Sequence, residues 1–369
     1  MADSATSSKL IFWALFALTV TAQVDDEGGA SARPAIVPAL FIFGDSLIDN
    51  GNNNNLASLA KANYFPYGID FRGGPTGRFS NGYTMVDTIA ELLGLPLIPA
   101  YSQAAESSTA QMRYGVNFAS AAAGILDNTG NNFVGRIPFN QQIKNFENSL
   151  DQLATLTGNA DLSQGLSKSI FFVGMGSNDY LNNYLMPNYD TKNQYNPQQY
   201  ADLLVHQYTQ QLTRLYNLGA RRFAIAGLGR MGCIPSILAQ SGANTCSDQV
   251  NQLVEPFNNN VKMMVENLGA KLPGVKFSYI DINNMFQDLV ANAPAYGFTV
   301  LNRGCCGLGR NRGQVTCLPF QTPCADRNRY VFWDAFHPTE AVNVLFGQKA
   351  FSGETDFAYP INIQQLASA

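Results

Sequence analysis

Ser46 is the first residue of this chain that is placed to do covalent chemistry. It follows the apolar run Leu40 to Phe43 and the dipeptide Gly44-Asp45. A short apolar run that stops at a glycine predicts a buried strand followed by a tight turn. Open α/β sheets bind their ligands at the carboxyl ends of the strands. A serine at such a position can act as a nucleophile when a base lies within reach.

The base can come from few places, because the chain contains only two histidines, His206 and His337. His206 lies in residues 200–218, where the spacing predicts a helix, and we expect it to have a structural role. His337 stands three residues after Asp334, so one turn can carry a carboxylate and the imidazole that it orients. We therefore predict a catalytic set of Ser46, His337 and Asp334.

Ester cleavage by a serine also needs hydrogen-bond donors for the oxyanion of the tetrahedral intermediate. The sequence offers three candidates, all at predicted strand ends: the backbone N–H of Ser46, the side-chain amide of Asn178 and a backbone N–H in residues 121–124. Within that small-residue run, Ala122 and Gly124 are alternative donors. An alanine N–H can serve if its φ stays negative.

The elements that must position these side chains alternate along the chain. Runs that favour strands occur at 40–43, 114–119, 169–173, 223–226 and 275–280. Segments with helical spacing occur at 85–93, 139–157, 200–218, 248–268 and 339–346. This alternation predicts an α/β fold with a parallel sheet covered by helices on both faces. No internal repeat or linker divides the sequence after residue 22, so we expect residues 23–369 to form one domain.

Residues 1–22 have the layout of a secretory signal peptide. Lys9 precedes an apolar run at 10–20 that is too short to span a bilayer, small residues follow it, and acidic residues occupy 25–27. An uncleaved anchor is the weaker alternative. The prediction is a secreted protein.

Secretion favours disulfides for the six cysteines. We favour a Cys233–Cys246 bond, which would close a local loop. We expect the other four cysteines to pair among themselves; these are Cys305, Cys306, Cys317 and Cys324. A zinc site is a weaker alternative, because no histidine lies within the cluster.

Composition limits the partners that the protein can have. The chain has 369 residues, of which 46% are hydrophobic, and a net charge of −4. These values are typical of a globular protein, and nucleic-acid binders instead carry a basic face. We expect no nucleic-acid partner, no integral membrane span, no cofactor and no metal. We expect a monomer that acts on a small-molecule or lipid ester.

Five motifs resemble those of the GDSL esterase/lipase family, also called SGNH hydrolases, in its secreted plant branch. They lie at 41–52, 77–82, 115–120, 176–179 and 334–338. The resemblance implies a three-layer, doubly wound, flavodoxin-like sheet. It also implies that Ser46 is the nucleophile, that Asn178 is an oxyanion donor, and that Asp334 and His337 complete the triad. The glycine that the family uses as a further donor aligns with Ala122.

The resemblance further implies an extracellular enzyme of the cell wall or apoplast that hydrolyses carboxylic esters of lipids or other acyl compounds through an acyl-enzyme. Two alternatives stay open. The acyl group could pass to an alcohol instead of water, which products formed with competing alcohols would reveal. The fold could also serve a catalytically silent binding or defence-associated protein, which a fluorophosphonate would fail to label.

Overall fold

The computed structural model describes residues 34–104, 109–242 and 245–369. The predicted signal peptide lies outside the described residues. The structure is built on a five-stranded sheet with the strand order β1-β2-β3-β4-β7. Its strands are β1 (Leu40–Gly44), β2 (Ile170–Gly174), β3 (Arg222–Ala226), β4 (Lys276–Ile280) and β7 (Ala358–Tyr359). The first four are parallel and β7 is antiparallel to β4.

The predicted strand at 114–119 is an irregular segment in the structure, although it lies where the sixth strand of the sheet would be. The N–H of Ile42 donates to the carbonyl of Val116 at 3.0 Å, and the N–H of Phe118 donates to the carbonyl of Ile42 at 2.7 Å. Gly115 has a φ of 120°, which interrupts an extended conformation at the start of the segment. Pairing is reduced to single bridges at Asn117.

Counting this segment, the parallel strands follow the order 2-1-3-4-5 of flavodoxin-like folds. The chain reverses direction across the sheet at β1, because the 114–119 segment lies on one side of β1 and β2 lies on the other. Such a switch point opens a crevice at the carboxyl end of the strand. Ser46 lies directly after that end of β1.

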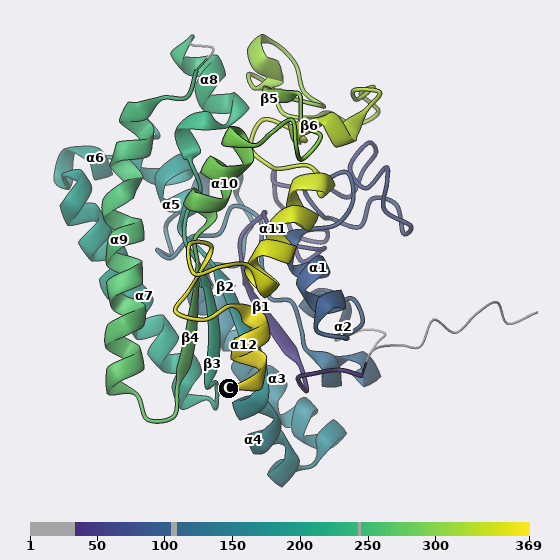
Figure 1. Ribbon diagram of the computed structural model, residues 1–369, viewed down its shortest axis with the longest axis vertical. Helices are drawn as coiled ribbons and strands as arrows, with labels where there is room; N and C mark the ends of the chain where they lie inside the picture. Colours follow the sequence, from purple (N-terminus) through teal and green to yellow (C-terminus); the bar gives the residue numbers. More distant parts are fainter. Residues whose placement is uncertain (1–33, 105–108, 243–244) are drawn as a thin grey trace, which may run out of the picture. The chain divides into compact units, whose positions relative to one another are not determined.

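Helices cover both faces of the sheet (Figure 1). One face packs against α3 (Phe139–Thr157), α7 (Pro197–Asn217) and α9 (Asp248–Lys271), and the other packs against α1 (Met85–Leu92), α10 (Ile282–Ala291), α11 (Glu340–Ser352) and α12 (Ile363–Ser368). Alternate residues of β1 enter the two cores: Phe41 and Phe43 face α3, while Leu40 and Ile42 face the α1 side. Burial on both faces explains why the strands are continuously apolar.

The predicted long helices are confirmed. The segment 139–157 agrees with α3 in both bounds, and the predicted helices at 200–218 and 248–268 correspond to α7 and α9. The remaining short elements are α2 (Tyr101–Ala104), α4 (Asn159–Lys168), α5 (Ser177–Asp179), α6 (Thr191–Gln194), α8 (Pro235–Ser241), β5 (Val300–Gly304) and β6 (Tyr330–Phe332). β5 and β6 form a separate two-stranded sheet.

Three disulfides are present, and the predicted Cys233–Cys246 bond is among them. The other four cysteines pair among themselves as expected, as Cys305–Cys324 and Cys306–Cys317. In the part of the chain that the structure describes, no cluster of histidine, cysteine and acidic side chains could hold a metal ion.

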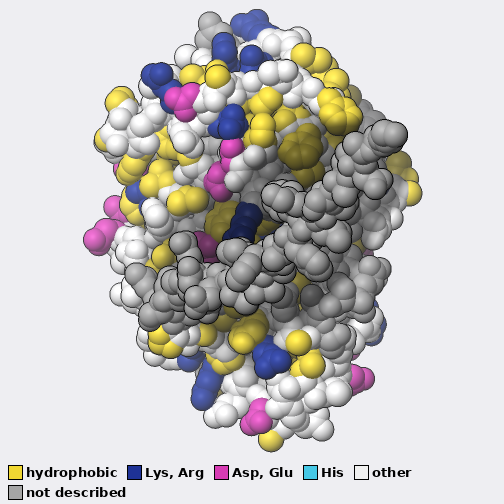
Figure 2. Space-filling view, turned by 90° about the vertical axis from the view of Figure 1, so that its right-hand side faces the viewer, with side chains coloured by type: hydrophobic (Ala, Val, Ile, Leu, Met, Phe, Trp, Pro, Cys, Tyr) yellow, Lys and Arg dark blue, Asp and Glu magenta, His cyan; other side chains and the backbone are white. Residues whose placement is uncertain are grey.

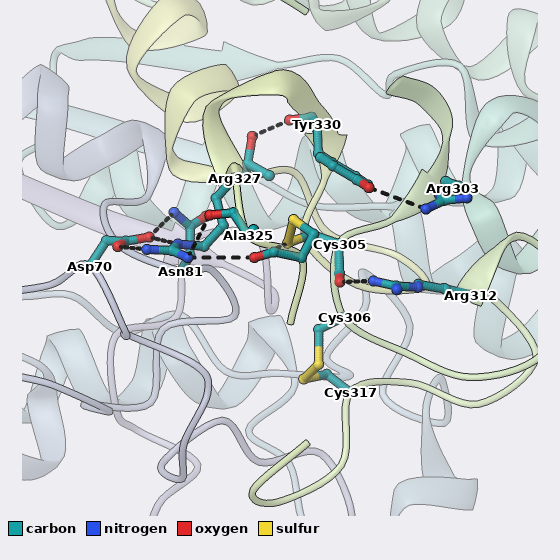
Figure 3. The surroundings of a disulfide bond; sticks show 12 residues. Asp70, Asn81, Arg303, Cys305, Cys306, Arg312, Cys317, Ala325, Arg327 and Tyr330 are labelled. Carbon is teal, nitrogen blue, oxygen red and sulfur yellow. Dashed lines mark hydrogen bonds and ion pairs between the residues drawn. A yellow bond between two sulfur atoms is a disulfide. The ribbon is translucent and has the colours of Figure 1, made fainter. Parts of the chain in front are cut away.

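The segment that carries the last two disulfides is tied to the loop after β1 (Figure 3). The guanidinium of Arg327 donates two hydrogen bonds to the carboxylate of Asp70, at 2.5 and 2.6 Å. Asn81 donates to the same carboxylate at 2.8 Å. Arg312 donates to the carbonyl of Cys305. The Arg327–Asp70 bonds connect the N-terminal part of the chain, which carries Ser46, to the C-terminal part, which carries His337.

Among the residues described, no helix is both long enough and apolar enough to cross a bilayer. Figure 2 shows one face of the molecule, on which charged side chains of both signs and small groups of hydrophobic side chains are interspersed among polar ones. Scattered apolar side chains of this kind are common on protein surfaces.

Candidate active site

The turn after β1 presents Ser46 at the edge of the sheet. Gly44 ends the strand with no room for a side chain, since a Cβ there would lie 2.4 Å from Cδ1 of Ile48. The buried side-chain amide of Gln142 bonds to both polar backbone groups of this glycine. The N–H of Gly44 donates to Oε1 of Gln142 at 3.0 Å, and Nε2 of Gln142 donates to the carbonyl of Gly44 at 2.8 Å. The backbone that carries Ser46 is therefore fixed by α3.

The structure brings the three predicted catalytic residues together. Nε2 of His337 lies 2.8 Å from Oγ of Ser46. Nδ1 of the same ring lies 2.9 Å from both carboxylate oxygens of Asp334. An ionised carboxylate can only accept, so Nδ1 carries the proton and Nε2 is left to accept from the serine hydroxyl. This is the arrangement that a general base needs.

The turn at 334–337 is held by its own backbone. The N–H groups of Phe336 and His337 both donate to Oδ1 of Asp334 at 2.8 Å. Asp334 is fully buried, and burial alone would raise the pKa of its carboxyl. The nearby His337 and the hydrogen bonds to the carboxylate overcome this effect and hold the pKa of Asp334 below its usual value. The carboxylate of Asp334 is therefore ionised, and it can accept the hydrogen bond from Nδ1 of His337.

Two contributors to this arrangement were missed from the sequence. The hydroxyl of Tyr67 donates to Oδ2 of Asp334 at 2.6 Å, and the ring of Phe79 lies 5.0 Å from the ring of His337. Phe79 belongs to the motif at 77–82, which contributed to the family resemblance but predicted no contact with His337. Tyr67 carries no sequence signal, because its partner lies 267 positions away in the chain.

Asp45 and Asp49 organise the turn by hydrogen bonds to its backbone. The carboxylate of Asp49 accepts from the N–H groups of Gly51 and Asn52 at 2.8 Å and from that of Ala121 at 2.9 Å. Burial raises the pKa of Asp45 to about 7, while a hydrogen bond from the N–H of Leu47 opposes the shift. Oδ2 of Asp45 is buried and has no partner among the described residues.

Ala122 does not meet the condition that its φ stay negative, although a positive φ strains the alanine without removing its N–H donor. Ala122 has a φ of 65°, in the left-handed region that favours glycine. Ala122 lies in the turn that the N–H of Ala123 closes by donating to the carbonyl of Ser120 at 3.2 Å, and its own carbonyl is packed so closely that a Cβ at Gly130 would lie 2.1 Å from it. The N–H of Ala122 nevertheless makes no hydrogen bond within the described residues, and Ala122 lines the cavity beside Ser46.

The other oxyanion candidates differ in position. Asn178 lines the same cavity, and its amide is oriented by two bonds: Nδ2 donates to the carbonyl of Ala123 at 2.9 Å, and Oδ1 accepts from Asn182 at 2.6 Å. One N–H of Nδ2 remains available to a ligand. Gly124 does not line the cavity; a Cβ there would lie 2.7 Å from the carboxylate of Asp179.

Asp179 was not singled out as a positioning residue from the sequence. Its carboxylate accepts from the N–H groups of Ile125 and Leu126 and from the hydroxyl of Thr129. Burial raises its pKa to about 6, and these hydrogen bonds oppose the shift. Because Asp179 follows Asn178 in the chain, it links the 121–129 turn to the end of β2. The second histidine, His206, is exposed on α7 and contacts Gln210.

A cavity of about 250 Å³ opens at Ser46 and His337. It runs along the carboxyl ends of the strands and beneath α10 and α11. Most of its wall is apolar, with side chains that include Phe172, Leu181, Phe286, Phe332, Val342 and Phe346. A wall of this kind favours an apolar chain over a charged one.

Comparison with known proteins agrees with this geometry. Residues 40–350 match the family model described as GDSL-like Lipase/Acylhydrolase. The chain belongs to the GDSL lipase/acylhydrolase family. It is 69% identical over 334 residues to GDSL esterase/lipase At1g71691 of Arabidopsis thaliana, covering 90% of this chain and 86% of that relative. It is 50% identical over 346 residues to GDSL esterase/lipase 7 of the same plant, covering 92% of this chain and 94% of that relative.

Membership of the GDSL family makes the protein a carboxylic ester hydrolase that acts on small-molecule esters. The mostly parallel sheet with helices on both faces agrees with the flavodoxin-like fold that the motifs implied. Membership of the family does not by itself assign a catalytic role to individual side chains of this protein.

Proposed function

We propose that this protein hydrolyses carboxylic esters of lipids or other acyl compounds through an acyl-enzyme on Ser46. The observation that carries the proposal is the 2.8 Å contact between Nε2 of His337 and Oγ of Ser46. The proton of Oγ passes to Nε2 as Oγ attacks the carbonyl carbon, and it is then given to the leaving alcohol. A water molecule, activated by the same imidazole, releases the acid and restores Ser46.

The oxyanion would be stabilised by three N–H donors at the cavity wall. These are the backbone N–H groups of Ser46 and Ala122 and the free N–H of the Asn178 side chain. Each such donor is worth about 3–4 kcal/mol of barrier in acyl-transfer enzymes. Ala122 is preferred to Gly124 because only Ala122 lines the cavity.

The proposal includes secretion after removal of residues 1–22, action as an extracellular monomer, and no cofactor, metal or nucleic-acid partner. The three disulfides support an oxidising compartment. Transfer of the acyl group to an alcohol would use the same triad.

The experiment compares the purified protein with its Ser46→Ala variant on p-nitrophenyl esters of graded chain length, with and without an added alcohol. We expect the variant to lose activity by about 10⁴-fold or more while its melting temperature is retained. A fluorophosphonate should label only the parent protein. Near-normal activity of Ser46→Ala would overturn the proposal, and alkyl esters formed in place of the free acid would identify a transferase.

A further inference from the structure

A second cavity, of about 370 Å³, lies beside the first at the carboxyl ends of β3 and β4. The two cavities share Gly229 and Arg230 in their walls, so they adjoin. Unlike the first, the second is lined mainly by polar side chains from α9 and the start of α10. No step of the proposed mechanism uses it.

The two cavities follow one edge of the sheet. Ser46 follows β1, Asn178 follows β2, Gly229 follows β3 and Asp281 follows β4. Because the four strands are adjacent and in register, Asp281 lies three strand spacings from Ser46, about 14 Å. A substrate with its ester at Ser46 can therefore place a further group in the polar cleft.

The lining of the polar cleft fits a neutral ligand with many hydroxyl groups. Side-chain amides supply both donors and acceptors, and those of Gln252, Asn259 and Gln287 make no hydrogen bond to the described residues. Carboxylates and cations are both present, so neither sign of ligand charge is favoured; the charged side chains are Asp248, Glu255, Asp281, Arg230 and Lys262. Amide and carboxylate groups together match the paired donors and acceptors of sugar hydroxyls.

One largely buried side chain presents a hydroxyl group to the cleft. Tyr279 lines the polar cleft and is only 2% exposed as a residue, and its hydroxyl makes no hydrogen bond to the residues that the structure describes. The hydroxyl oxygen is not among the buried atoms that lack a partner, so it is open to the cleft. It lies against Gly227, where a Cβ would lie 2.2 Å from the hydroxyl oxygen. A hydroxyl group of a ligand in the cleft can therefore bond to it in place of solvent.

We propose that this polar cleft binds the alcohol part of the substrate, and that this part is a neutral, polyhydroxylated group such as a sugar. The inference rests on the proposed function, since it requires ester cleavage at Ser46. The apolar cavity holds the acyl chain, whose burial contributes about 0.8 kcal/mol per methylene. The natural substrate is then an acylated sugar or a similar polyol ester.

The test compares two esters with the same acyl chain, octanoyl glucose and methyl octanoate, on the parent protein and on the variants Gln287→Ala and Tyr279→Phe. We expect the parent to cleave the sugar ester with at least tenfold higher kcat/KM. Either variant should lower the ratio of the two kcat/KM values several-fold, mainly through KM for the sugar ester. Gln364→Ala, an exposed glutamine on α12 outside both cavities, should leave the ratio unchanged.

Equal cleavage of the two esters by the parent would overturn the inference and leave the proposed function standing. So would an unchanged ratio in Gln287→Ala, which is an exposed position where folding is not at risk. An ester with a phosphate in place of the sugar is a third arm. Its faster cleavage would also overturn the inference, because Arg230 and Lys262 would then recognise an anion. Loss of activity on every ester would instead count against the proposed function.

Discussion

The hydroxyl of Tyr67 lies 2.6 Å from Oδ2 of Asp334, whereas the backbone N–H groups of the aspartate's own turn donate to Oδ1. Tyr67 is only 1% exposed. Its hydroxyl donates to a carboxylate that also receives the imidazole, so Tyr67 acts on the candidate base through Asp334. It is a positioning residue.

We predict that Tyr67→Phe lowers kcat by about tenfold or more with little change in KM. A hydrogen bond to a charged group contributes about 1.5–3 kcal/mol, and the variant leaves the carboxylate with one partner fewer. Because the Tyr67 bond helps to keep the pKa of Asp334 low, its loss raises that pKa. The acid limb of the rate profile should therefore move to higher pH, which steady-state rates at graded pH would measure.

Tyr64→Phe is the matched control. It removes a hydroxyl that donates to the carbonyl of Cys317 at 2.9 Å and does not reach Asp334. A profile that shifts equally in both variants would contradict the role assigned to Tyr67.

Ala122→Gly should keep the activity and leave the protein as stable or more stable. A left-handed φ costs an alanine about 1–2 kcal/mol, while a glycine gives up about 0.5–1 kcal/mol through chain entropy. The expected change in the free energy of unfolding is therefore a gain of up to about 1.5 kcal/mol, measured by urea denaturation. A large loss of stability would show that the Cβ of Ala122 makes contacts that outweigh its backbone strain.

Asp45→Asn should flatten the dependence of stability on pH. The folded-state pKa of Asp45 is raised from 3.8 to about 7, so the folded protein holds a proton that the unfolded chain releases. This contribution is fully present below pH 3.8 and is lost as the pH rises through about 7. Melting temperatures between pH 5 and pH 8 should therefore fall less steeply in the variant, because asparagine is neutral throughout.

Asp49→Asn provides the contrast. The two oxygens of Asp49 accept three backbone N–H groups, and an amide nitrogen would face one of these donors. We expect this variant to lose about 1–3 kcal/mol above about pH 6, where the carboxylate is ionised in the folded protein, because burial raises the pKa of Asp49 to about 6. If Asp45→Asn behaved in the same way, its carboxylate would have to be ionised in the folded protein.

Leu181→Phe should shorten the acyl chain that the enzyme prefers. Leu181 is half-buried and lines the apolar cavity, so a larger ring there reduces the space for the distal methylenes. One methylene is worth about 0.8 kcal/mol, or about fourfold in kcat/KM. The ratio of kcat/KM for decanoate to that for butanoate should therefore fall by more than tenfold. Leu185→Phe, on the same segment but outside the cavity wall, should retain the parent ratio.

The sequence predicted the layout of the fold because the fold depends on local patterns. Continuous apolar runs marked β1, β2, β3 and β4, and the spacing of apolar residues marked α3 with its correct bounds. The same patterns overstated the strand at 114–119, because Gly115 allows a φ that no pattern of hydrophobicity reveals.

The cluster of Ser46, His337 and Asp334 was predictable because its residue types are rare or closely spaced: the chain has only two histidines, and His337 has an aspartate in its own turn. Tyr67, Gln142 and Asp179 were not predicted as supports, since each acts through a partner at least 50 positions away. The left-handed Ala122 was missed for a related reason. Its positive φ belongs to the turn between Ser120 and Ala123, and nothing in the chemistry of an alanine signals it.

The contact between Ser46 and His337 joins residues 291 positions apart, one on the first strand of the sheet and the other on the last turn before α11. A ribosome therefore synthesises the proposed nucleophile early and the proposed base late. A nascent chain that has not reached residue 337 lacks the imidazole, so under the proposed mechanism it cannot attack esters. The order of translation thus delays the proposed activity until most of the domain has been synthesised.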